Sequence, residues 1–204
     1  MLSSITPLGE RGRGNRWGVT VAWFVAGSTL GGLVLGALLG LGGALLGRVV
    51  PDRGRLLGVL AVAVVAVAVD AARRPALLPS WRRQVDERWM DEYRAWVYGL
   101  GWGAQLGAGV LTIVSSASTY LVVALAVLVG SLPAGVALGA TFGLTRGLTL
   151  LAGRHLVTPA ALRSFHQRLQ GQRRTAAAAV ILADALVALT ALVSLVQGSD
   201  GGLV

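Results

Sequence analysis

The sequence predicts an all-α, polytopic membrane protein, and three observations lead to this fold class. The 204 residues are 54% hydrophobic and only 13% charged, whereas roughly 25% of residues are charged in an ordinary soluble domain. The mean hydropathy is +0.69. The arginines gather between long apolar segments, as they do in cytoplasmic loops. The bilayer is therefore the first partner that the sequence implies, and this pattern argues against nucleic acid as the reason for the net charge of +9.

Long apolar segments predict the membrane-spanning helices, because about 20 helical residues cross a bilayer core. They are residues 17–47, 56–72, 134–153 and 175–196. Glycines four residues apart, most regularly from Gly135 to Gly147, let neighbouring helix backbones approach closely. We therefore expect a Gly-rich, close-packed bundle. The same glycine faces would serve equally between chains, which leaves a homo-oligomer open.

The uncharged stretch 96–130 is too long for one ordinary span and barely long enough for two. Its first part, residues 99–109, is rich in glycine, which lowers helix propensity. One interpretation is a helix broken within the membrane, where irregular backbone lines a binding site. The other is a Gly-rich helix packed tightly against its neighbours.

The distribution of arginine predicts the topology. Arginine-rich segments usually stay on the cytoplasmic side of a membrane. Three such segments occur here, residues 1–16, 73–94 and 154–174, and they share one side only if residues 96–130 cross once. We therefore expect five crossings, or six segments if the central helix is broken or re-entrant. Residues 1–16 would form a cytoplasmic head, and residues 17–204 a single transmembrane domain in a bacterial inner membrane.

An amphipathic surface helix is predicted at about residues 80–94. Trp81, Trp89 and Trp96 recur at roughly helical spacing, while charged residues occupy the other faces. Such a helix lies on the membrane surface. It could instead dock a partner protein through the three tryptophans.

Polar groups at membrane depth are the candidate functional residues, because they are costly there unless they are paired or hydrated. Arg146 and Asp184 lie within predicted spans, at depths that allow an ion pair, a gate, or an ion or proton site. The candidate substrate-contacting residues are Gln105, Gly107, Gly109, Ser115, Ser116, Arg146 and Asp184.

The sequence offers no catalytic or metal-binding constellation. It contains no cysteine, which excludes disulfides and thiolate metal sites, and its two histidines share one basic loop. The carboxylates of residues 86–92 stand among arginines, as on a solvated helix face. We therefore expect a protein that is not an enzyme and that holds no metal and no cofactor.

The order of segments resembles the CcdA/DsbD family of cytochrome c biogenesis and thiol-disulfide membrane proteins. The resemblance lies in the Gly-rich span FVAGSTLGGLVLGALLGLGGALL and in the later stretch YGLGWGAQLGAGVLTIVSS. Both cysteines of that family are missing, so its dithiol relay cannot operate here. The resemblance implies a compact bundle with a bend at Gln105, Gly107 and Gly109.

Two functions follow as expectations. The first is a small CcdA-like transporter that moves a solute or ion through a cavity at the broken helix. The alternative is a non-catalytic membrane scaffold or subunit that holds a redox or biogenesis partner, for example a membrane or thioredoxin-like protein.

Overall fold

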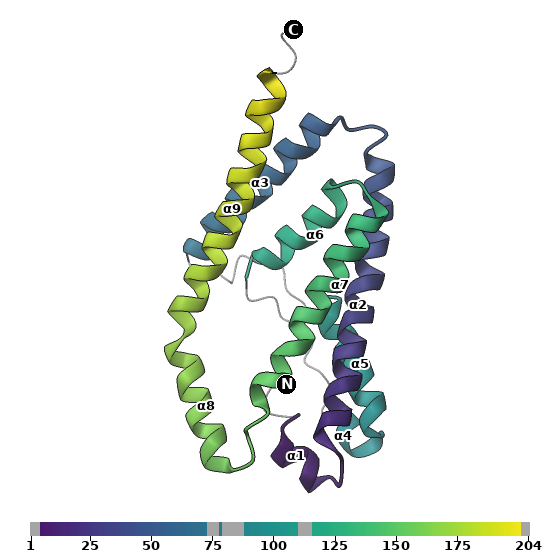
Figure 1. The fold of residues 1–204 in the computed structure, drawn as a ribbon, viewed down its shortest axis with the longest axis vertical. Helices are drawn as coiled ribbons and strands as arrows, with labels where there is room; N and C mark the ends of the chain where they lie inside the picture. The colour runs from purple at the N-terminus through teal and green to yellow at the C-terminus, as the bar shows by residue number, and fades with distance from the viewer. Residues whose placement is uncertain (1–4, 73–77, 79–87, 110–115, 201–204) are drawn as a thin grey trace. The chain divides into compact units, whose positions relative to one another are not determined.

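The computed structural model describes residues 5–72, 78, 88–109 and 116–200, and every regular element in these ranges is a helix (Figure 1). The elements are α1 (Pro7–Gly12), α2 (Trp17–Leu46), α3 (Asp52–Ala71), α4 (Trp89–Glu92), α5 (Ala95–Gly107), α6 (Ser118–Leu128), α7 (Leu132–Leu148), the 3-10 helix η2 (Thr149–Gly153), α8 (Pro159–Gly171) and α9 (Arg173–Asp200). The all-α prediction is confirmed.

Four helices are long and apolar enough to cross a membrane, as expected of an integral membrane protein. They are Trp17–Leu46, Asp52–Ala71, Leu132–Gly153 and Arg173–Gly198, and they coincide with the four apolar segments of the sequence. The predicted fifth crossing is not among them, because the central stretch forms two short helices of 13 and 11 residues.

The central stretch is broken, as one of the two interpretations expects, but the break follows most of the glycine-rich part, because residues 99–107 are helical in α5. Helix α5 ends at Gly107, and Gly109 follows with a φ of +70°, a left-handed conformation that favours glycine. Helix α6 begins only at Ser118. Residues 110–115, which include the candidate Ser115, lie outside the described residues.

The basic stretch 154–174 is not the continuous loop that its polarity predicts, because it contains α8. The hydroxyl of Thr158 accepts a hydrogen bond from the backbone N–H of Ala161 at 3.2 Å, and Pro159 occupies the first turn. A capping threonine followed by proline is a common start of a helix. The Thr158–Pro159 pair was therefore the feature of the sequence that could have predicted the start of α8.

The chain divides into two compact units. Unit 1 consists of residues 1–34, 81–113 and 139–174, and unit 2 of residues 35–80, 114–138 and 175–204. Both units contain a part of α2 and a part of α7, while α5 belongs to unit 1 and α6 to unit 2.

In unit 1, glycines bring α2 into backbone contact with α5 and α7. A Cβ atom at Gly27 would overlap the carbonyl oxygen of Leu100 in α5, and one at Gly32 would overlap the carbonyl oxygen of Gly139 in α7. Buried Ser28 donates from Oγ to the carbonyl oxygen of Gly143 at 2.6 Å. The predicted close packing is therefore present, and these glycines serve contacts within the chain.

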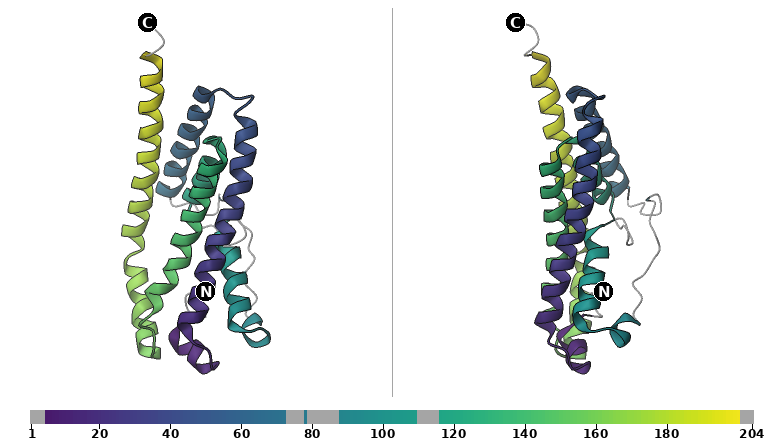
Figure 2. Two further views of the ribbon diagram at one scale, coloured as in Figure 1. Left: turned by 45° about the vertical axis from the view of Figure 1, so that its right-hand side comes forward. Right: turned by 90° about the vertical axis from the view of Figure 1, so that its right-hand side faces the viewer.

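The core of unit 1 is aromatic and includes the beginning of the described chain. Phe24, Tyr98 and Trp102 are buried together with Ile5 and Leu150. In both views of Figure 2, α1 lies beside the first turns of α2. The head is therefore part of the packed structure of unit 1.

Unit 2 has a smaller core built on small side chains. Ala63 and Ala66 of α3 pack against Ala117 and Leu121 at the start of α6. In the same unit, a Cβ atom at Gly43 of α2 would overlap the carbonyl oxygen of Val127 in α6. Helix α6 is therefore held by α3 on one side and by the end of α2 on another.

Candidate functional site

The most buried polar cluster surrounds Glu10 in unit 1. Glu10 belongs to α1, and its side chain is fully buried. One carboxylate oxygen, Oε2, accepts hydrogen bonds from the Thr20 hydroxyl and from the Tyr98 hydroxyl, both at 2.7 Å. The other oxygen, Oε1, pairs with Arg13 at 2.5 Å. The carboxylate thus joins the head to α2 and α5.

Charge in this cluster is balanced locally. Burial alone would lower the pKa of Arg13, but its hydrogen bond to Glu10 and the charge of that carboxylate raise the pKa above its ordinary value. The side-chain amide of Asn15 also donates to the Tyr98 hydroxyl at 3.1 Å. Because the buried charge is paired and hydrogen-bonded, the cluster fastens the head in place.

The second polar cluster surrounds the N-terminus of α6 in unit 2. Asp70 of α3 accepts hydrogen bonds from the Ser116 hydroxyl at 2.6 Å and from the backbone N–H of Ala117 at 2.9 Å. The Ser118 hydroxyl lies 2.7 Å from both carboxylate oxygens of Asp184 in α9. Two carboxylates therefore face the positive end of the helix dipole.

Asp70 performs the function of a helix cap from a different helix. The residue before α6, Ala117, has no side chain that could cap it. In the sequence, Asp70 is followed three and four positions later by Arg73 and Arg74, and this spacing predicts an interfacial charge pair. Those arginines lie outside the described residues, and the described partners of Asp70 are Ser116 and Ala117.

Replacing Asp70 with alanine is expected to lower the free energy of unfolding by about 1–3 kcal/mol, because a backbone N–H and a hydroxyl lose their acceptor. Thermal unfolding of the purified protein in detergent measures the change. Asp91→Ala, an exposed acid of α4, is the control and should unfold at the wild-type temperature. Equal unfolding temperatures for the two variants would exclude a capping role.

The predicted substrate-contacting residues fall into different units. Gln105, Gly107, Gly109 and Arg146 belong to unit 1, whereas Ser116 and Asp184 belong to unit 2. The hypothesis that these residues line one cavity stays a prediction. At Gly107 the structure agrees with the alternative interpretation, because a Cβ atom there would overlap the backbone of Ser28.

Arg146 and Asp184 each have a partner within their own unit. The Arg146 guanidinium lies over the Phe142 ring, 5.2 Å from its centroid, and Asp184 bonds to Ser118. A Cβ atom at Gly109 would come within 2.7 Å of Cε1 of Phe142. Glycine just after α5 therefore leaves room for the Phe142 ring, over which Arg146 lies.

The predicted amphipathic helix is described only in part. Residues 80–87, including Trp81, lie outside the described residues, and α4 covers Trp89–Glu92. Trp89 packs on Gly101 of α5, and its ring centroid lies 5.6 Å from that of Tyr93. The ring centroids of Trp96 and Trp23 are 6.1 Å apart, and the two residues are 46% and 41% exposed. The rings form two pairs, Trp89 with Tyr93 and Trp23 with Trp96, and we call these four residues together the aromatic face.

Comparison with known proteins identifies the family. The chain is 36% identical to methylamine utilization protein MauF of Paracoccus versutus over 188 residues, which cover 89% of the chain and 68% of that relative. The chain belongs to the MauF family. The MauF proteins of Methylorubrum extorquens and Methylophilus methylotrophus are 31% and 32% identical, and the chain spans about half of their length, 50% and 52%. No protein-family model and no solved structure matches the chain.

Membership of the MauF family corrects the resemblance. The CcdA/DsbD interpretation is wrong, and with it the association with cytochrome c biogenesis and the main hypothesis of a CcdA-like transporter. That resemblance rested on the order of spans and on abundant glycine. Close helix packing alone requires such glycines, as the contacts of α2 show, so they do not discriminate between families.

The burial of Glu10 does not follow from its place in the sequence. Glu10 stands in a polar segment with three arginines, where a solvated carboxylate is the ordinary expectation. The available signal was Thr6–Pro7, which caps α1: the Thr6 hydroxyl accepts from the backbone N–H of Gly9 at 3.1 Å. An ordered helix in the head would have indicated that the head packs on the bundle.

Proposed function

We propose that this chain is a non-catalytic membrane scaffold of a methylamine utilization system, which holds a protein partner at the membrane. Its similarity to MauF over 89% of its length carries the proposal. Two features of the structure support it: four helices of membrane-spanning length and a head fastened to unit 1 through Glu10. Membrane-spanning helices and an ordered head are what such a scaffold requires.

The aromatic face is the surface that we assign to the partner. Tryptophan and tyrosine are enriched in protein interfaces, since they bury a large apolar area and keep a polar atom for hydrogen bonding. Trp96 and Tyr93 are about half exposed, at 46% and 49%. The contact between Trp89 and Gly101 fixes α4 against α5 and so orders this surface.

A graft into the relative tests the role in methylamine utilization. The matched region of the Paracoccus versutus MauF is replaced by this chain, and the hybrid is expressed in a strain that lacks its own MauF. We expect growth with methylamine as the only carbon source. A hybrid that accumulates in the membrane but does not restore this growth contradicts the proposal, and growth on succinate controls for general fitness.

A cross-linking experiment tests the assigned surface. The chain contains no cysteine, so a photoreactive group attaches uniquely to a Trp96→Cys variant of the hybrid once any cysteines in its remaining MauF segments are replaced. We expect a cross-link to one protein of the methylamine utilization system. Leu30→Cys, at a residue of α2 that is 52% exposed, is the matched control. Equal labelling from both positions would exclude the aromatic face as the docking surface.

A further inference from the structure

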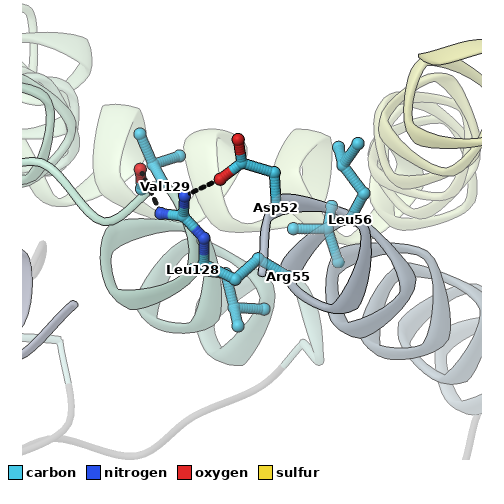
Figure 3. Close-up of a pocket in the computed structure, with 6 residues that line it drawn as sticks. Asp52, Arg55, Leu56, Leu128 and Val129 are labelled. Carbon is cyan, nitrogen blue, oxygen red and sulfur yellow. Dashed lines mark hydrogen bonds and ion pairs between the residues drawn. The ribbon is translucent and has the colours of Figure 1, made fainter. Parts of the chain in front are cut away.

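A pocket of about 270 Å³ lies in unit 2 between the first turns of α3 and the end of α6 (Figure 3). Its lining consists of Asp52, Arg55, Leu56, Val59, Leu128 and Val129. Four of these side chains are aliphatic, and the other two form an ion pair. Because α3 is long and apolar enough to span a membrane and starts at Asp52, the pocket belongs at one edge of the bilayer.

The Arg55 guanidinium is held in a defined position. Its Nη1 donates to the carbonyl oxygen of Val129 at 3.3 Å, and its Nη2 pairs with the Asp52 carboxylate. Gly130, with a φ of +66°, leaves the space that Nη1 occupies, because a Cβ atom there would overlap it. The cation therefore sits at the C-terminus of α6, where the helix dipole favours positive charge.

The two charged side chains of the pocket differ in their exposure to solvent. The Asp52 side chain is 86% exposed, whereas that of Arg55 is 18% exposed. A guanidinium carries two hydrogens on each terminal nitrogen. The bonds to Val129 and Asp52 use one on each, so a hydrogen on each terminal nitrogen can still bind a ligand oxygen.

We infer that this pocket binds one phospholipid whose zwitterionic headgroup carries a primary ammonium, as in phosphatidylethanolamine. The phosphate accepts from Arg55, the ammonium donates to the exposed Asp52, and an acyl chain lies along Leu56, Val59 and Leu128. A headgroup with only a negative charge would bind the arginine but be repelled by the aspartate. The aliphatic wall and the edge of the bilayer favour a lipid over free phosphoethanolamine. This inference is independent of the proposed function.

Native mass spectrometry of the full chain in detergent tests the inference. The protein is titrated separately with phosphatidylethanolamine, phosphatidylcholine and phosphatidylglycerol of identical acyl chains. We expect one phosphatidylethanolamine to bind about tenfold more tightly than either of the others, because only its headgroup has a positively charged hydrogen-bond donor for the Asp52 carboxylate. The Asp52→Asn variant should lose this preference, and the exposed Asp91→Asn control should keep it.

A second variant covers the case in which Asp52→Asn does not fold. Leu56→Trp fills the apolar part of the pocket and should weaken the binding of all three lipids. Free phosphoethanolamine should not compete with the lipid. Equal binding of the three lipids by the wild type, a preference that survives Asp52→Asn, unchanged binding by Leu56→Trp, or full competition by free phosphoethanolamine would each overturn the inference.

Discussion

Replacing Glu10 with alanine is expected to lower the free energy of unfolding by about 3–5 kcal/mol, which places it among the most damaging single changes in unit 1. The substitution removes the shared acceptor of the Thr20 and Tyr98 hydroxyls and the partner of the Arg13 guanidinium. Thr20 and Tyr98 are fully buried, so water cannot easily replace the lost carboxylate. Each buried donor left without an acceptor costs about 1–3 kcal/mol.

Two measurements distinguish detachment of the head from a general loss of folding stability. Thermal unfolding in detergent reports the stability, and limited digestion with trypsin reports whether the head has detached, because the head contains Arg11, Arg13 and Arg16. We expect Glu10→Ala to be cut in the head much faster than the wild type. Glu92→Ala, an exposed acid of α4, is the control. A Glu10→Ala protein that resists trypsin as the wild type does would refute the role of this cluster.

The Glu10→Gln variant distinguishes the effect of the negative charge of Glu10 from the effect of its size and hydrogen bonds. Its amide oxygen can still accept from the Thr20 and Tyr98 hydroxyls, but its NH2 group faces Arg13 and no longer neutralises it. We expect an intermediate loss of stability, about 1–3 kcal/mol. If Gln and Ala were equally damaging, the negative charge rather than the number of hydrogen bonds would be what holds the head.

Much of the fold could be predicted because membrane helices follow from local composition. The four long apolar segments became α2, α3, α7 and α9, since segment length and hydropathy suffice to define a span. The position of the break in the central stretch was less predictable, because residues 99–107 are helical in α5 although glycine lowers helix propensity there, and among the glycines of 99–109 only Gly109 has a left-handed conformation. The actual helix ends, at Gly107 and Ser118, depend on contacts with other segments.

The polar clusters were less accessible to sequence reasoning because their partners are distant in the chain. Glu10 meets Tyr98 across 88 positions, and Asp184 meets Ser118 across 66. Asp70 likewise bonds to Ser116 across 46 positions and to Ala117 across 47. Pairing of this kind is decided by the packing of helices, which a single sequence does not reveal.

The spacing of the glycines likewise does not reveal which helices pack together. The pattern in α2 predicted close packing, but it did not say which glycine faces which neighbour. Gly27 meets α5, Gly32 meets α7, and Gly43 meets α6. Neighbouring Gly42 has no atom within 4 Å of where its Cβ would lie. Two adjacent glycines of one helix therefore have opposite environments.

Gly43→Ala is expected to destabilise the protein by about 1–3 kcal/mol, whereas Gly42→Ala should be neutral or stabilise it by up to about 1 kcal/mol. The new methyl group at Gly43 would overlap the backbone carbonyl of Val127, which cannot rotate away as a flexible side chain could. At Gly42 the methyl group meets open space and restricts only the unfolded chain. Thermal unfolding of both variants in the same detergent measures the difference.

This pair of variants tests the helix arrangement within unit 2 because its members differ in environment and not in chemistry. Both exchange a glycine for an alanine in the same helix, one position apart, so their intrinsic effects on helix propensity cancel in the comparison. The remaining difference reports the approach of α2 to α6. Equal unfolding temperatures for Gly43→Ala and Gly42→Ala would mean that these two backbones are not in contact, and the support of α6 by α2 would have to be abandoned.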